Sequence, residues 1–300
     1  MTIGVGALGC FPVTVTQVEP SFPVAGAAEY VLFLSPDDSD LATLAAGSAA
    51  MAVANLQDQQ PSKKWRSTST ADYVTVTFTG PVAANAVTWC AHNGSAGLYL
   101  RVRGYDSAAD FAALTNVVVD TNWKSAWPLG IKPRERNWLN HGSLLRWTND
   151  RPLQYWRIDV ADGGAGQTYT EAGRLMLGRW VQPTYNLDHE GGLGRVSADL
   201  QITSDWGATL TEARFRPRAL DARFSAQEQR DAFDWFDELQ RLRGTAGDFV
   251  VIIDPAATTD FHRYFLHGLL GSTGMMQPVR LWSGTGFLWS FTVPVKETIF

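Results

Sequence analysis

The sequence predicts a mainly β protein with two domains and one packed helix. Short segments that alternate apolar and polar residues recur along the chain, and turn-forming residues separate them. Tyr73–Thr79 (YVTVTFT) shows this alternation most clearly and is rich in β-branched and aromatic residues. Only one segment has helical periodicity. The chain has 300 residues, which at roughly 100–200 residues per domain corresponds to two domains.

Strands are expected throughout the first 180 residues. They are Phe11–Val18, Tyr30–Leu34, Tyr73–Thr79, Ala86–Cys90, Leu98–Tyr105, Val117–Asp120, Trp156–Val160 and Glu171–Val181. Clusters of Gly, Pro, Asn and Asp separate these strands, for example at Ser35–Asp40 and Asn93–Gly97. Many short strands at this spacing predict a sandwich or a barrel. We assign residues 30–180 to this first domain and residues 1–29 to an N-terminal arm or first strand.

The predicted helix covers about residues 225–243. Ser225 and Glu228 match a capping box, in which each side chain satisfies a backbone N–H of the first turn. One apolar stripe then follows at helical spacing: Ala232, Trp235, Phe236, Leu239 and Leu242. Gly244 is placed to end the helix.

Strands are also expected after this helix. Phe249–Ile253 and Arg263–Leu270 are two of them, and Leu281–Val295 reads as a pair of strands around Ser283–Gly286. Residues 181–300 are therefore predicted to form a second β-sandwich or barrel on which the helix packs.

The composition excludes several classes of protein. Hydrophobic residues make up 45% of the chain and charged residues 18%, which excludes a disordered chain. The two cysteines, Cys10 and Cys90, are too few for a disulfide framework, a four-cysteine zinc site or an iron–sulfur cluster. A formal net charge of −5 argues against binding to phosphate backbones, so we expect no nucleic-acid recognition.

Composition also favours an assembly component. No cationic side chain precedes Lys63, so a secretory signal is not expected. Apolar stretches such as Ala45–Leu56 are short and interrupted by Gly and Ser, so we expect no membrane insertion. Of the 25 basic residues 20 are Arg, and the chain has 12 Trp. Abundant Arg and Trp are typical of protein interfaces. A soluble protein of a reducing compartment is the expected setting.

No residue pattern predicts catalysis. Gly4–Gly9 matches G-x-G-x-x-G, but no strand precedes it and no helix follows, so it is interpreted as part of a flexible arm. His262 and His267 lie five apart in an expected strand and would point to opposite faces. Asp37–Asp40 is interpreted as a turn, with a calcium ion as the alternative. We expect no catalytic residues, no cofactor and no metal site, and the calcium question stays open.

Arg214, Arg216 and Arg218 are the first candidate interaction residues. They alternate with Phe215 and Pro217, so a strand here would present a row of guanidinium groups on one face. The row is either a solvated sheet edge protected by charge and Pro or an oligomer interface that meets an acidic neighbour.

Trp123, Trp127 and Trp138 are the second set of candidates. With Trp147 they crowd the segment Asp120–Asp150, which also contains several arginines. Such residues are either core, protein-contact or sugar-stacking residues, and the sequence leaves the three roles open. Trp65, Trp89 and Trp156 lie in expected framework strands, so these three are assigned to the core.

Several stretches resemble a known family. They are Ala54–Pro61, Trp65–Ser67, His92–Asn93, Leu100–Arg103, Tyr155–Ile158 and Glu171–Gly178. This pattern resembles minor tail and tail-tip proteins of long-tailed bacteriophages that carry a galactose-binding-like (discoidin-type) jelly roll, over about residues 30–180. Further on, Arg223–Phe224, Phe249–Pro255 and Trp289–Glu297 resemble the tail-tube-like domain of distal tail proteins, although the two domains stand here in the reverse of the commonest order.

The resemblance implies a structural role without catalysis. The implied protein is a tail-tip or baseplate component of the virion, assembled in the host cytoplasm, whose symmetric ring (a hexamer or a trimer) joins the tail tube to the adsorption apparatus. Its implied partners are further copies of itself and the tail tube, tape-measure and tail-tip hub proteins. The alternative is a carbohydrate-binding module that recognises host-surface glycans. A glycan-cleaving enzyme needs two carboxylates that flank a bond, and the sequence nominates no such pair.

Overall fold

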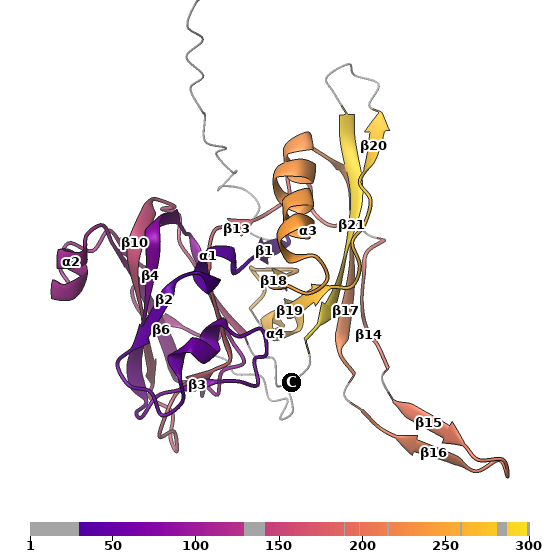
Figure 1. Ribbon diagram of the computed structural model, residues 1–300, viewed down its shortest axis with the longest axis horizontal. Coiled ribbons are helices and arrows are strands. Elements are labelled where there is room, and N and C mark those ends of the chain that lie inside the picture. Colours follow the sequence, from indigo (N-terminus) through magenta and orange to yellow (C-terminus); the bar gives the residue numbers. More distant parts are fainter. Residues whose placement is uncertain are drawn as a thin grey trace, which may run out of the picture.

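Antiparallel sheets dominate the structure, a computed structural model that describes residues 30–128, 142–188, 190–197, 199–214, 216–258, 260–280 and 287–298. All strand pairs among these residues are antiparallel, and the predicted mainly β fold is confirmed (Figure 1). The expected N-terminal arm, with Gly4–Gly9 and Cys10, lies outside the described residues.

A β-sandwich forms the first part of the fold. Its larger sheet has the order β2 (Thr43–Ala46), β4 (Ala71–Ala83), β10 (Pro152–Asp162), β6 (Leu98–Tyr105), β7 (Val119–Asp120), with β8 (Lys124–Ser125) also on β6. Its smaller sheet has the order β12 (Arg174–Gly178), β5 (Ala86–Cys90), β9 (Gly142–Arg146), and β3 (Trp65–Arg66) pairs with β11 (Glu171–Ala172) nearby. Trp65, Trp89 and Trp156 are buried between these sheets, which confirms their predicted place in the core.

An eight-stranded sheet forms the second part. Its order is β13 (Trp180–Val181), β1 (Leu32–Leu34), β18 (Asp248–Ile252), β19 (Phe265–Leu270), β21 (Phe287–Glu297), β17 (Arg218–Gln227), β14 (Gly192–Arg195), and β20 (Gln277–Arg280) also pairs with β21. The strand expected at Phe249–Ile253 is present as β18. Of the pair expected within Leu281–Val295, the second strand is present in β21, whereas residues 281–286 lie outside the described residues; the partner strand β20 ends before the predicted segment. β1, which the sequence placed at the start of the first domain, instead lies between β13 and β18.

The helix that packs on this sheet starts later than its predicted capping box. Ser225 belongs to β17, whose bulge gives Ala226 a φ of 59°, and the Ser225 hydroxyl donates to Asp188. The capping-box prediction is therefore wrong, because β17 continues its pairing with β21 up to Gln227. The helical residues are a π-helical segment η3 (Asp231–Asp237) followed by α3 (Glu238–Arg243), ended by Gly244 as predicted.

The apolar stripe of the helix packs against one face of the eight-stranded sheet (Figure 1). Trp235 and Phe236 contact Phe291 of β21, the Phe236 and Phe291 rings being stacked with centroids 4.3 Å apart. Leu242, the last residue of the predicted stripe, is exposed instead. The helix therefore covers one face of the sheet through residues 232–239, and its last turn extends beyond the packed stripe.

The opposite face of the eight-stranded sheet packs on the smaller sheet of the sandwich. Residues alternate along β12, so Leu175 and Leu177 face the sandwich core while Met176 faces the second sheet. Met176 and Cys90 meet Leu32, Ile252, Phe265 and neighbouring apolar residues in this layer. The described chain is therefore a stack of three sheets and a helix, with short helices α1 (Asp37–Asp40), η1 (Val53–Gln57), α2 (Ala108–Ala113) and α4 (Phe261–Tyr264) at its edges.

Candidate interaction surfaces

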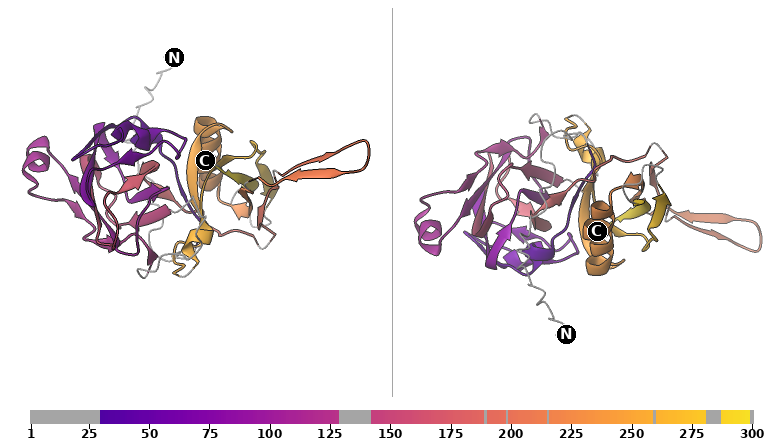
Figure 2. Two further views of the ribbon diagram at one scale, coloured as in Figure 1. Left: turned by 90° about the horizontal axis from the view of Figure 1, so that it is seen from below. Right: turned by 90° about the horizontal axis from the view of Figure 1, so that it is seen from above.

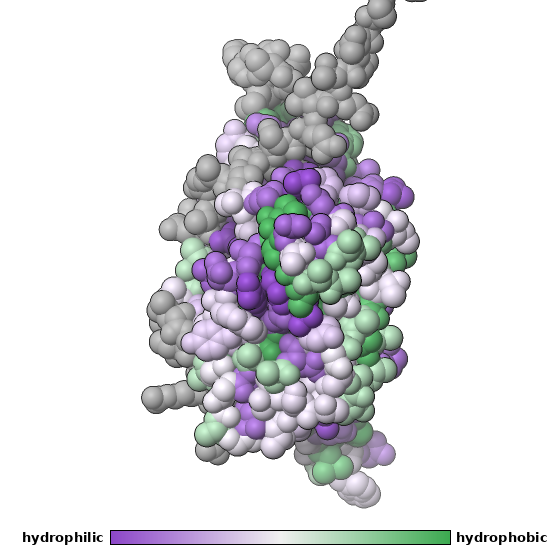
Figure 3. Space-filling view, turned by 90° about the vertical axis from the view of Figure 1, so that its left-hand side faces the viewer, coloured by the Kyte–Doolittle hydropathy of each residue, from purple (hydrophilic) through white to green (hydrophobic). Residues whose placement is uncertain are grey.

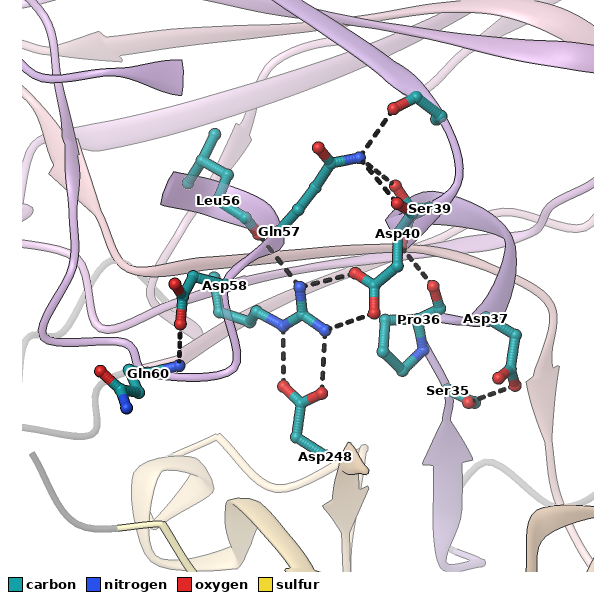
Figure 4. Close-up of polar contacts among 12 residues, drawn as sticks. Ser35, Pro36, Asp37, Ser39, Asp40, Leu56, Gln57, Asp58, Gln60 and Asp248 are labelled. Carbon is teal, nitrogen blue, oxygen red and sulfur yellow. Dashed lines mark hydrogen bonds and ion pairs between the residues drawn. The ribbon is translucent and has the colours of Figure 1, made fainter. Parts of the chain in front are cut away.

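Arg174 is fully buried at the junction of the two parts. Its guanidinium donates to both carboxylate oxygens of Asp248, at 2.7 and 2.8 Å, and to both oxygens of Asp40, at 2.6 and 2.9 Å (Figure 4). Arg174 belongs to β12 of the sandwich and Asp248 to β18 of the second sheet. His267 of β19 places its Nε2 2.8 Å from the Asp248 carboxylate. These bonds fix the two sheets relative to each other.

The charges of this cluster hold one another in place. Burial alone would raise the pKa of Asp248, but the hydrogen bonds from His267 and Arg174 hold that pKa well below its usual range. Burial likewise opposes the charge of Arg174, and its bonds to Asp40 and Asp248 raise its pKa nonetheless. Since Arg174 is completely shielded from solvent, this cluster is a structural element rather than a site open to a ligand.

The acidic residues Asp37, Asp38 and Asp40, for which calcium binding was the alternative interpretation, lie in helix α1. Two of them bind arginines of the same chain: Asp40 binds Arg174, and Asp37 lies 2.6 Å from Arg243. Throughout the part of the chain that the structure describes, His, Cys, Asp and Glu side chains form no group that could hold a metal ion. No described helix has the length and hydropathy to span a bilayer.

A hairpin arm projects from the edge of the eight-stranded sheet. It consists of β15 (Leu200–Thr203) and β16 (Thr209–Glu212), which pair only with each other, and it extends away from the body in both views of Figure 2. Every residue of the two strands is exposed. The arm continues the ribbon of β14 and β17 beyond the sheet.

One face of this arm is apolar. Ile202 pairs with Leu210 across the hairpin, and Leu200 lies two residues before Ile202 on the same face, where it pairs with Glu212 at the base of the arm. The exposed fractions of Ile202 and Leu210 are 55% and 73%. Trp206, in the turn, is 96% exposed. The other face carries Gln201, Thr203, Thr209 and Thr211. The arm is thus an amphipathic hairpin whose apolar face contacts solvent.

Two of the three candidate arginines lie at the base of the arm. Arg216 donates to Asp199 at 2.6 and 3.0 Å, and the backbone N–H of Arg214 donates to the same carboxylate at 2.8 Å. These bonds, with one from Ser197, hold the pKa of Asp199 down to about 2. Asp199 thus clamps the two sides of the arm together, while both arginine side chains remain exposed.

Arg218 lies elsewhere, and its prediction as an interface residue is wrong. It is 3% exposed, pairs with Glu297 at 2.9 Å and donates to the backbone carbonyls of His262, Arg263 and Phe265. The expected row of three guanidinium groups does not form, because the strand β17 begins only at Arg218 and turns its side chain inward.

His262, expected in a strand with His267, belongs to α4 instead.

The candidate tryptophans also differ from one another in their exposure to solvent. Trp123 is 46% exposed, immediately before β8. Trp127 is buried: its Nε1 donates to the Ser95 carbonyl at 2.6 Å and its ring lies against His92. A partner-contact role for Trp127 is therefore wrong, because no partner could reach it. Trp147 packs against the sandwich core. Trp138 lies outside the described residues.

The outer face of the six-stranded sheet is polar and aromatic. The Arg157 guanidinium lies 3.5 Å from the centroid of the Tyr73 ring and donates to Asp159 at 2.7 Å. Figure 3 shows the side of the molecule that lies on the left in Figure 1, where hydrophilic residues gather near the centre beside a narrow group of hydrophobic ones. The side chains of Arg157 and Asp159 are held by these contacts and are mostly covered by their neighbours.

Trp123 adjoins one edge of this face. Tyr99 of β6 is 45% exposed and pairs with Ser125 of β8, two residues after Trp123. Arg101, next on the same face of β6, forms two hydrogen bonds with Asp120. Two exposed aromatic rings and a bidentate ion pair thus lie along one sheet edge.

Sequence reasoning missed the Arg174 cluster and the Asp199 clamp. A charged residue between apolar ones, as in Gly173-Arg174-Leu175-Met176, is a signal for a buried arginine, since Arg in such a run needs a carboxylate partner. For the arm, alternation in Leu200-Gln201-Ile202-Thr203 was a signal for a strand.

Comparison with known proteins gives structural similarity only. No protein-family model matches the sequence, and no curated protein matches it. Similar solved structures include the lectin domain of lectinolysin with Lewis B antigen (11% identity, TM-score 0.35) and the module CpGH89CBM32-5 from Clostridium perfringens with GalNAc-β-1,3-galactose (14%, 0.34). A third is the N-terminal domain of the single-strand break repair protein XRCC1 (12%, 0.36).

Each of these three alignments covers 49% of this chain and 99% of the solved chain. Two of the three solved domains are bound to carbohydrates and the third belongs to a DNA repair protein. What each binds is therefore a property of that protein.

Proposed function

We propose that this protein is a non-enzymatic structural subunit that assembles with copies of itself through the hairpin arm. The observation that carries this proposal is the apolar face of the arm, formed by Leu200, Ile202 and Leu210, which nothing in the described chain covers. A two-stranded hairpin alone in water is marginally stable. An apolar face on such a hairpin gains stability when a neighbouring molecule covers it.

We propose that this assembly is a ring. The arm extends away from the body at the sheet edge formed by β14 and β17, and in the proposed contact it binds a different surface of the neighbouring copy. Such head-to-tail contacts close into a ring or continue as a filament. The buried Arg174 cluster supports this role, because Arg174 of β12 and Asp248 of β18 bind each other across the junction of the two parts.

The setting we propose is the tail tip of a long-tailed bacteriophage. There the subunits would form a ring, a hexamer or a trimer, between the tail tube and the adsorption apparatus. The support is the resemblance of the framework segments given above together with the arm. Arg214 and Arg216, exposed at the arm base, would lie at the edge of the subunit contact.

Light scattering coupled to size exclusion, over a concentration series, tests assembly. The wild-type chain should form a discrete oligomer, and an Ile202→Ser/Leu210→Ser variant should elute as a monomer with unchanged thermal unfolding. Gln201→Ser, on the opposite face of the same hairpin, is the matched control and should still assemble. A wild-type chain that stays monomeric at every concentration, or an assembly indifferent to the double substitution, would refute the proposal.

A second candidate function is glycan binding at the edge of the outer face. Exposed Tyr99 and Trp123 beside the Arg101–Asp120 pair are the observation that favours it, because sugars stack on aromatic rings and hydrogen-bond to planar polar groups. Trp123→Ala and Tyr99→Ala should each abolish binding on an array of host polysaccharides. Tyr185→Ala, an equally exposed ring in the second part, should leave binding intact. Absence of wild-type binding to any glycan would exclude this candidate.

A further inference from the structure

A cavity of about 400 Å³ lies between the sandwich and the second part of the chain. The segment around β8 and the end of β9 line one side, and residues 255–258 with α4 line the other. This volume falls in the range of about 300–1,000 Å³ typical of pockets for small ligands. Its location makes any occupant a bridge between the two parts.

The polar lining of the cavity is cationic. Its charged side chains are Lys124 and Arg146, and its hydroxyls are those of Thr121, Ser125 and Thr258. No carboxylate is among the described residues that line it, although the chain has a net charge of −5. Against that acidic background, a concave site with two cations and no anion is a distinct electrostatic feature.

Arg146 is a partly buried cation without an acidic partner among the described residues. It is half-buried, and its contact is the face of the Trp180 ring at 6.0 Å. Burial lowers the pKa of Arg146, with no acidic group acting against this effect. The more deeply buried arginines of this chain are compensated: Arg174 by Asp40 and Asp248, and Arg218 by Glu297. No ion pair joins Arg146 to any described residue.

We propose that this cavity binds an oxyanion, namely a carboxylate, phosphate or sulfate group of a small ligand. The planar fork of Arg146 would bind two of its oxygens, and Lys124 would supply the second charge. The hydroxyls of Ser125 and Thr258 are placed to bind further oxygens from opposite sides of the cavity. This site is separate from the arm. It adjoins the Tyr99–Trp123 edge through β8, whose Lys124 and Ser125 line the cavity, but neither Tyr99 nor Trp123 is among the lining residues. Anion binding here is therefore tested independently of the proposed function.

Calorimetric titration with inorganic phosphate, with sulfate and with galacturonate tests the proposal, and neutral galactose is the matched sugar. We expect saturable binding of at least one anion and none of galactose. Binding of galacturonate alone would assign the site to acidic sugars, and binding of all three anions would assign it to the oxyanion itself. Absence of saturable binding by every anion overturns the proposal.

Two substitutions locate the site. Arg146→Met and Lys124→Met should each weaken anion binding by about tenfold or more, as loss of a charge-assisted contact requires. Lys124 is exposed, so its substitution leaves folding intact even if Arg146→Met does not. Arg151→Met, which removes an exposed arginine paired with Asp106, should bind as the wild type does. Binding unchanged in Lys124→Met and Arg146→Met, or equally weakened in Arg151→Met, also overturns the proposal.

Discussion

Arg174 and Asp248 meet in a fork-to-fork ion pair although 74 residues separate them, and both side chains are completely buried. One belongs to the sandwich and the other to the eight-stranded sheet. A buried pair of this kind contributes little net stability compared with apolar residues of the same volume, but it strongly penalises any arrangement that separates its members. The pair therefore specifies how the two parts dock.

Removal of Arg174 should be severely destabilising. Arg174→Met removes the guanidinium that both carboxylates share and leaves Asp248 with His267 alone and Asp40 with Arg243 at 3.6 Å. Removal of one partner of a buried ion pair costs about 3–5 kcal/mol. Urea denaturation followed by tryptophan fluorescence measures the loss. Arg151→Met, at an exposed pair, should change stability by less than about 1 kcal/mol. Equal effects of the two substitutions would show that the buried pair does not fix the docking.

The arm base should loosen in acid. The pKa of Asp199 is held down to about 2 by the Arg214 N–H, Arg216 and Ser197, against about 3.9 in an unfolded chain. A depressed folded-state pKa gives a contribution that is complete above about pH 4 and is lost as the pH falls toward 2. Amide hydrogen exchange of residues 196–217 at pH 6 and pH 2.5, corrected for intrinsic rates, should show this loss. Asp199→Asn should show weak protection already at pH 6.

Gly142 should tolerate no side chain. A Cβ at this position of β9 would lie 2.0 Å from the ring of Phe265 in β19, across the junction of the two parts. Gly142→Ala should therefore cost about 1–3 kcal/mol through overpacking. Gly163→Ala, where a Cβ meets nothing within 4 Å, is the control. Thermal unfolding distinguishes the two, and a neutral Gly142→Ala would mean that Phe265 can move aside.

Cys90 should be inert in the folded protein. Burial raises the pKa of its thiol to about 12, so the reactive thiolate is nearly absent at pH 8. Iodoacetamide should modify the Cys90 peptide only in denaturant, as read by mass spectrometry. Leu41→Cys, at a position 81% exposed, supplies a reactive control in the same chain. Rapid native alkylation of Cys90 would contradict the packing of this layer.

Local patterns predicted strands with one buried face, and also strands buried on both faces such as β5 and β18, whose short apolar runs are themselves a strand signal. Trp156 and its neighbours in β10 alternate between a buried core and solvent, so period two is visible in their sequence. The helix was recognised from its apolar stripe, but its start was misplaced, because the pairing of Gln227 with Trp289 extends β17 through Ser225. Trp289 lies 62 positions after Gln227, so a local pattern contains no information about this pairing.

The candidate sites were harder to predict for the same reason. Arg214, Arg216 and Arg218 share one sequence pattern, yet two lie at the exposed arm base and the third is enclosed beside Glu297. Their different exposure follows from the start of β17, because only Arg218 belongs to that strand. Likewise Trp127 is buried whereas Trp123 is exposed, and the buried indole of Trp127 donates a hydrogen bond to the Ser95 carbonyl.

The place of β1 restricts how this chain can be divided or recombined. Leu34 pairs with Trp180 on one side and Val250 on the other, so a strand from the start of the described chain is an inner member of the later sheet. A gene fragment that encodes residues 181–300 alone would specify a sheet with an interior gap. The two parts are interlaced rather than modular, and evolution or engineering can transfer the second only together with the strand that precedes the first.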